Sequence, residues 1–182
     1  MLTVVGGALI MAAVLALAAI MLVKAGQKRD IQSILKRIEA VMPEQRAPAI
    51  IERSSDSRMP AIEIDDNDFI GILELPGRGV KLPVAAAWSK SPWAFRPARY
   101  VGSAYDGTLI IGGSSENGNF GFADSVDAGE TVIFTDITGK VFTYEIARVN
   151  HADNATAETL RSDASLTLFV NKNGGYIIIR CK

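Results

Sequence analysis

The sequence of 182 residues has a single cysteine, Cys181, and a single histidine, His151. One cysteine excludes an internal disulfide framework and a multi-cysteine metal site, and one histidine excludes a histidine-rich metal centre. Basic and acidic residues nearly cancel, 19 against 20, whereas a nucleic-acid-binding domain would gather a basic excess on one face. Composition therefore removes disulfide scaffolds, histidine-rich metalloenzymes and nucleic-acid binders.

Residues 1–23 contain no charged side chain, and the run from Leu2 to Val23 is apolar except for one threonine and two glycines. A helix of this length rises ~33 Å, enough to cross the ~30 Å hydrocarbon layer of a membrane. The alternative is a cleaved signal peptide, whose apolar region normally spans about 7–15 residues behind a basic start. We predict an uncleaved transmembrane helix over residues 1–23.

An amphipathic segment follows, with apolar residues at spacings of three and four: Ile31, Ile34, Leu35, Ile38 and Val41. This spacing predicts a stalk helix over residues 24–42 with one apolar stripe. Because the stripe is short, a helix that packs on its own domain or lies along the membrane is favoured over a dimerising or docking stalk. Pro43, Pro48 and the polar run at residues 53–58 then predict a linker over residues 43–60.

The remaining residues, 61–182, have the pattern of a β domain. Candidate strands rich in Val, Ile, Phe and Thr recur at residues 69–75, 80–84, 108–112, 131–135, 141–149, 165–170 and 176–181. Gly-containing turns separate several of them, residues 155–160 favour a short helical turn, and residues 88–100 have no regular pattern. We therefore predict an all-β fold, a closed or nearly closed β-barrel.

Short sequence motifs in this domain occur in the order found in the sortase family. The overall resemblance is to sortases of the class B and D type. The motifs are Phe69–Pro76, Leu82–Val84, Trp88–Ser89, Arg99–Tyr105, Leu109–Gly113, Asn119–Phe122, Gly129–Asp136, Phe142–Ile146, Leu166–Phe169 and Arg180–Cys181. The resemblance covers roughly residues 60–182, and the membrane helix with its stalk fits the family plan. It implies the sortase-like closed β-barrel with short helices.

Sortases are cysteine transpeptidases that attach surface proteins to the cell envelope of Gram-positive bacteria. The resemblance implies three catalytic positions: a cysteine that forms an acyl-enzyme, a histidine acid and base, and an arginine that holds the oxyanion or the substrate. All three differ here. The histidine position is Ser114, the cysteine position is Asn171 and the arginine position is Tyr176.

These substitutions remove the chemistry. The amide of Asn171 is a poor nucleophile and cannot form a thioester. Ser114 has no proton that titrates near neutral pH, and Tyr176 carries no positive charge there. We therefore predict a catalytically inactive homologue in which Ser114, Asn171 and Tyr176 are degenerate site positions and no cofactor or metal is used.

Other residues are poor replacements for the lost groups. In a regular strand, Cys181 would lie on the face opposite Tyr176 and ~16 Å along it, so we predict a structural thiol. Arg180 shares the face of Tyr176 but lies ~13 Å along the strand, too far to replace the arginine. His151 stands in a polar stretch that we predict to be an exposed connection, with a solvated imidazole.

One alternative activity and two further clusters of residues bear on this hypothesis. Ser114 could serve an enzyme of altered chemistry, a peptidase or transpeptidase, but it has no local histidine and no Gly-x-Ser-x-Gly elbow. Acidic residues alternate like calcium ligands at Glu63, Asp65, Asp66 and Asp68, but without the Gly and terminal Glu of an EF-hand they favour a solvated turn. Aromatic residues could line a peptide groove or pack under a loop; they are Trp88, Trp93, Phe95, Tyr100 and Phe169.

The sequence thus predicts a membrane-anchored pseudo-sortase that binds a sorting-signal-like peptide, a cell-wall fragment, or a surface-protein or pilus-assembly partner. An architectural subunit that binds no peptide is a further possibility. The resemblance implies a single-pass cell-membrane protein with its domain outside the cytoplasm. The charge pattern opposes this orientation, because basic residues from Lys24 to Arg37 follow the helix and the positive-inside rule would keep that side in the cytoplasm.

Overall fold

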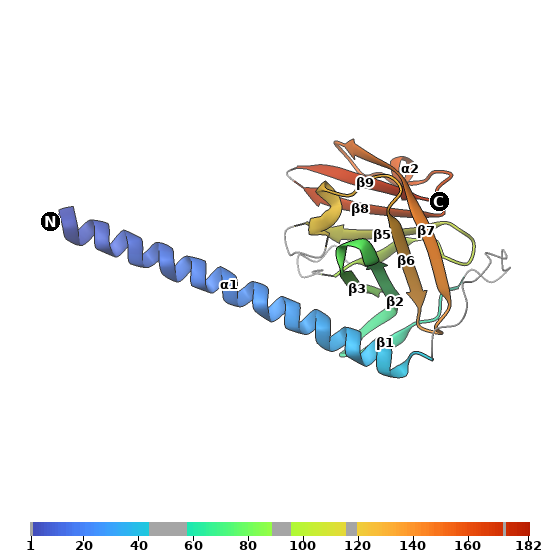
Figure 1. Ribbon diagram of the computed structural model, residues 1–182, viewed down its shortest axis with the longest axis horizontal. Coiled ribbons are helices and arrows are strands. Elements are labelled where there is room, and N and C mark those ends of the chain that lie inside the picture. The colour runs from blue at the N-terminus through green and yellow to red at the C-terminus, as the bar shows by residue number, and fades with distance from the viewer. Residues whose placement is uncertain (1, 44–57, 89–95, 116–119, 173) are drawn as a thin grey trace.

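The computed structural model describes residues 2–43, 58–88, 96–115, 120–172 and 174–182 (Figure 1). In the first helix, side chains are described for residues 11–23, 25–26 and 28–41. Most of the linker predicted over residues 43–60 lies outside these ranges, as do Trp93 and Phe95 of the predicted groove.

A single helix, α1 (Leu2–Val41), contains both the apolar segment and the amphipathic segment. Its N-terminal part extends away from the barrel (Figure 1). Neither segment contains a proline, and Pro43 follows shortly after the helix ends. From Met11 onward α1 is long and apolar enough to cross a membrane, on length and composition. The apolar anchor and the stalk are therefore continuous in structure.

The C-terminal part of α1 packs against the barrel. Ile34, Leu35 and Ile38 are buried in one cluster with residues from the first two strands, Ile64, Phe69 and Ile72. At this contact Arg37 donates to both carboxylate oxygens of Asp65 at 2.7 Å, and Lys81 lies 2.7 Å from Glu39. The stripe therefore packs on its own domain, as favoured from its length. Val41 stays exposed, so the buried stripe ends at Ile38.

Within the described residues, nine strands form one sheet. They are β1 (Ile62–Ile64), β2 (Asn67–Leu75), β3 (Val80–Ala85), β4 (Ala98–Val101), β5 (Leu109–Ser114), β6 (Thr131–Asp136), β7 (Val141–Ala152), β8 (Leu166–Lys172) and β9 (Gly175–Cys181). Their order is β1-β2-β3-β4-β5-β8-β9-β7-β6, and β6 pairs again with β2. This pairing closes strands β2 to β9 into a barrel, which confirms the predicted fold class.

In the described ranges, three short helices accompany the strands: η1 (Pro76–Arg78), η2 (Gly121–Asp124) and α2 (Ala157–Leu160). α2 confirms the helical turn predicted at residues 155–160. Arg78 of η1 makes two 2.6 Å hydrogen bonds to the carboxylate of Glu130. These hydrogen bonds, together with one donated by the backbone of Asp127, lower the pKa of Glu130 to about 2.

The barrel interior is apolar and contains most of the buried hydrophobic residues. Its largest members are Phe120, Phe134 and Phe142, with aliphatic residues from β2, β5, β8 and β9 around them. Alternate residues of each strand point inward, so the intervening residues of β5, β8 and β9 point outward. The outward-facing set provides the candidate site.

Two expectations about secondary structure need correction. β7 continues to Ala152 because it pairs with β9 as far as Ala152 opposite Tyr176, so His151 lies in a strand rather than in a connection. Its side chain is nevertheless exposed. β4 occupies part of the stretch predicted to be irregular, and it pairs with β5 at Ala98, Arg99 and Val101.

Candidate functional site

The three positions that the resemblance assigns to catalytic groups, Ser114, Asn171 and Tyr176, lie side by side at the ends of neighbouring strands. β5 runs parallel to β8 with Ser114 opposite Asn171, and β8 runs antiparallel to β9 with Asn171 opposite Tyr176. Residues directly opposite each other in a sheet point to the same face and stand about 5 Å apart. The fold therefore gathers side chains from positions 114, 171 and 176 into one row, although 57 residues separate the first two in the chain.

This row lies on the outer face of the barrel. Two residues further from the strand ends, on the same outer face, Gly112 is opposite Phe169 and Phe169 is opposite Ile178. Phe169 and Ile178 are buried in a small cluster with Ile110 and with Leu160 of α2, separate from the barrel interior. At the row itself exposure increases: Ser114 and Tyr176 are partly buried and Asn171 is exposed.

Aromatic rings border the row on one side. The ring of Phe169 lies 5.4 Å from both Trp88 and Tyr100, and 6.4 Å from Tyr176, between ring centroids. Gly112 makes room for this group, because a Cβ there would lie 2.4 Å from Trp88 and 2.5 Å from Phe169. Of the predicted groove residues that the structure describes, Phe169 is packed and Trp88 is partly open.

Two cavities adjoin the aromatic group, and α2 contributes to both. The larger, of about 640 Å³, is lined by Ala86, Ala87, Trp88, Arg99, Tyr100, Val101, Gly102, Ala157 and Arg161. We call it the β4–α2 cavity. The smaller, of about 350 Å³, is lined by Val101, Gly102, Thr108, Ile110, Leu160, Arg161, Ser162, Ala164 and Thr167. Because they share Val101, Gly102 and Arg161, the two cavities are adjacent.

α2 is held in place by two sets of hydrogen bonds. Thr156 and Thr159 form a capping box at its N-terminus, with a 3.2 Å bond from the amide of Thr159 to the hydroxyl of Thr156. At its C-terminus, Arg180 donates to the carbonyl oxygens of Thr159 at 2.6 Å and Leu160 at 3.2 Å. Arg180 therefore fixes the helix that forms one wall of both cavities.

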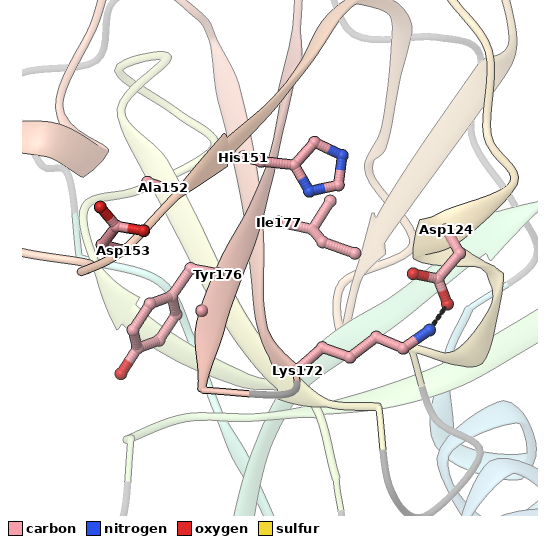
Figure 2. Close-up of a pocket in the computed structure, with 8 residues that line it drawn as sticks. Asp124, His151, Ala152, Asp153, Lys172, Tyr176 and Ile177 are labelled. Carbon is pink, nitrogen blue, oxygen red and sulfur yellow. Dashed lines mark hydrogen bonds and ion pairs between the residues drawn. The ribbon is translucent and has the colours of Figure 1, made fainter.

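A third cavity, of about 420 Å³, adjoins Tyr176 at the β8–β9 hairpin (Figure 2). It contains His151 and the ion pair between Lys172 and Asp124. His151 is opposite Ile177, whereas Tyr176 is opposite Ala152, so the imidazole and the phenol leave opposite faces of the sheet. Figure 2 shows the two rings pointing in different directions. His151 is therefore not placed to act as a base for the row.

The cysteine is also separate from the row, because it lies five residues along β9 from Tyr176 and points into the barrel. Cys181 is fully buried in the barrel interior and opposite Leu166, and burial raises the pKa of its thiol to about 12. A thiol with this pKa is protonated at neutral pH, and its sulfur is shielded from substrate. The structural role predicted for Cys181 agrees with this position.

The acidic run from Glu63 to Asp68 spans the β1–β2 hairpin: Glu63 pairs with Asp68 across the two strands, and Asp65 and Asp66 form the turn. Asp65 and Asp66 take positive φ angles of 50° and 59°, a left-handed conformation that Asp tolerates in tight turns. Asp65 faces Arg37 of α1 instead of converging with its neighbours. Within the described residues, no three His, Cys, Asp or Glu side chains are placed to hold a metal ion.

The sequence interpretation missed two cationic residues at the site. Arg99 lies in β4, which was not predicted, and Arg161 directly follows α2. The capping box of Thr156 and Thr159 is a local signal that could have marked the start of α2, but nothing local indicated that α2 packs over β5 and β8.

Searches for related proteins return solved structures only: no family model matches, and neither does any curated protein. The lid mutant of sortase C1 from Streptococcus agalactiae matches with a TM-score of 0.55 and 16% identity, over 66% of this chain and 70% of that one. Sortase A from Corynebacterium diphtheriae matches with a TM-score of 0.54 and 15% identity, over 86% and 83%. Sortase C1 from Streptococcus suis has a TM-score of 0.51 and 20% identity, over 62% and 71%. The chain therefore has the sortase fold.

Proposed function

We propose that this chain is a membrane-anchored, catalytically inactive sortase homologue that binds an extended peptide on the outer face of its barrel. The observation that carries the proposal is the register that sets Ser114, Asn171 and Tyr176 in one row. By the family resemblance these are the positions of the acid–base histidine, the nucleophilic cysteine and the arginine. Their adjacency is the geometry that three cooperating catalytic groups require.

The row cannot perform the family reaction with its present side chains. Acyl transfer needs a thiolate or an activated hydroxyl, and neither the carboxamide of Asn171 nor the phenol of Tyr176 supplies one. Activation of Ser114 would require a base within hydrogen-bond reach, and His151 faces the opposite side of the sheet. The three positions therefore lack the cysteine, histidine and arginine of the family reaction, and the face around them is suited to binding.

That surface supports peptide binding. The aromatic group of Trp88, Tyr100 and Phe169 stands beside the row, and the two cavities under α2 continue along the same face. A structure of sortase C from Clostridium perfringens with the C-terminal cell wall sorting motif has the same fold, with a TM-score of 0.52 at 15% identity. We propose that the ligand here is a sorting-signal-like segment of a surface or pilus protein.

The helix α1 supports a proposal for the cellular location of the protein. α1 has the length and composition of a membrane span and continues directly into the barrel packing. We propose a single-pass protein with its barrel outside the cytoplasm, in the cell envelope where sortases act. This assignment follows the fold and opposes the positive-inside expectation from Lys24 to Arg37, so reporter fusions at the C-terminus form its direct test.

The experiment combines turnover and binding on the full chain in detergent micelles. A sorting-signal peptide carrying a fluorophore and a quencher is incubated with the protein and a glycine-oligomer amine, and calorimetry measures binding of the unlabelled peptide. We expect saturable binding and no cleavage. Cleavage that Ser114→Ala abolishes would replace the binding function by an enzyme of altered chemistry. Absence of binding to any peptide would leave only an architectural role.

A further inference from the structure

One edge of β4 opens into the β4–α2 cavity. β4 pairs with β5 at Ala98, Arg99 and Val101, and among the described residues its other edge pairs only with β3, at Ala98 opposite Ala85. From Arg99 to Gly102 this edge lines the cavity. A strand edge without a partner presents N–H and C=O groups that an added extended segment can pair with.

The exposed apolar side chains of the barrel lie at this same edge. Among the described residues after α1, the large hydrophobic side chains that are exposed are Tyr100, at 37%, and Val101, at 38%. Both line the β4–α2 cavity, together with Trp88 and the methyl groups of three alanines. The cavity therefore offers apolar contact beside an open backbone edge, which is the combination used in strand addition.

The charge of the cavity has one sign. Its lining contains Arg99 and Arg161 and no acidic residue. In the part of the chain that the structure describes, neither arginine takes part in an ion pair. Arg99 donates through its Nε to the carbonyl of Ala86 at 2.9 Å, and no hydrogen bond joins its terminal nitrogens to another described residue. Planar guanidinium groups suit carboxylates, which they bind in bidentate fashion.

We propose that the β4–α2 cavity selects an extended peptide segment that carries an aspartate or glutamate, which pairs with the free edge of β4 and places its carboxylate between Arg99 and Arg161. The inference rests on the proposed peptide-binding function and adds its ligand class, an acidic segment. Backbone pairing supplies affinity without regard to sequence, the apolar wall accepts an alternate side chain, and the two arginines supply the charge preference.

The test uses the full chain in detergent micelles and synthetic peptides as probes. The probes are amidated, acetylated nonapeptides with randomised Val, Thr and Ala flanks and a central Glu, Gln or Lys, and calorimetry measures their affinities. We expect the Glu peptides to bind about tenfold more tightly than the Gln peptides, a difference of about 1.4 kcal/mol. High salt should reduce this preference, because screening weakens an accessible charge pair.

Variants locate the effect. Arg161→Gln should bring the Glu peptides to the affinity of the Gln peptides, and Arg99→Gln should do so as an independent check. Arg148→Gln is the matched control, since Arg148 is an exposed arginine on β7 that pairs with Asp163 and does not line the cavity. N-methylation of alternate peptide amides should abolish binding, because it removes the donors for strand pairing.

The outcomes separate the two proposals. Equal affinities for Glu and Gln peptides, with binding retained, would overturn the acidic preference and leave peptide binding intact. Binding that tolerates N-methylation would overturn pairing with β4. No binding by any peptide would overturn both proposals, and binding of hexagalacturonate in place of every peptide would identify an anionic glycan surface instead.

Discussion

The row of positions 114, 171 and 176 can be tested with an introduced thiol. In Asn171→Cys the new sulfur occupies an exposed position, where a thiol has its ordinary pKa of about 8.5. Cys181, with a pKa of about 12 and no exposure, is the internal reference. At pH 7.5 the thiolate fractions are about 9% and about 0.003%, so thiolate supply alone should favour labelling of the new site about 3,000-fold.

Permanent cations at the neighbouring positions should then shift that thiol. A unit charge about 5 Å away in a largely solvated setting contributes about 1 kcal/mol, which is about 0.7 pKa unit. We therefore expect Tyr176→Arg and Ser114→Lys, each combined with Asn171→Cys, to lower the thiol pKa from about 8.5 to about 7.8. At pH 7 this raises the thiolate fraction about fourfold.

The assay is iodoacetamide labelling followed by intact-mass spectrometry across pH 5–10, which reads the pKa from the profile instead of from a single rate. Profiles are preferable because a thiol of lower pKa is also intrinsically less nucleophilic. Thr143→Arg, an exposed position on β7 away from the row, is the control and should leave the profile unchanged. An unchanged pKa with a cation at both neighbouring positions would refute the register on which the site rests.

Three further predictions concern stability and packing. Ile38→Ala should lower the free energy of unfolding by about 2–4 kcal/mol in urea titrations, because the side chain is fully buried between α1 and the barrel. Val41→Ala, at an exposed position, should change the free energy of unfolding little. Equal effects of the two substitutions would contradict the packing of α1. Gly112→Ala should shift tryptophan emission to the red, since the added methyl group displaces the ring of Trp88, and an unchanged spectrum would mean that the ring does not lie on β5. The pKa of Glu130 is lowered to about 2 by its arginine partner, so its stabilising effect is complete above its unfolded pKa of ~4.3 and is lost as pH falls toward 2. Glu130→Gln should flatten acid unfolding in that window, and an unaltered acid profile would show that the pair does not form.

The fold could be predicted where strands are half-buried and regular. Residues 69–75 and 176–181 were located because apolar and turn residues mark their limits, and both strands are present within one or two residues of prediction. β4 was missed since it has four residues and its exposed positions include Tyr100 and Val101, which blur the alternation. The polar residues around His151 suggested a loop because the end of β7 projects beyond the core, where both faces meet solvent.

The site could be predicted only in part, since its geometry depends on long-range pairing. No local spacing in the sequence relates Ser114 to Asn171, because the parallel register of β5 and β8 brings them together. In the sequence, only the order of the sortase-like motifs indicated that these two positions are neighbours. The cavities were beyond sequence reasoning for the same reason. They exist because Arg180, far from α2 in the chain, binds the last carbonyls of that helix and fixes it over the sheet.

The continuity of α1 bears on how the barrel would meet its partners. If residues 2–23 lie in the bilayer, as proposed, the seven helical residues before Ile31 form a spacer of about 10 Å, and the next two turns pack against the barrel. The helix is then continuous between the membrane and the domain. The barrel would keep one height and one tilt above the lipid, so encounters would be confined to a thin layer at the membrane surface, and only partners that present their segment at that level could engage it.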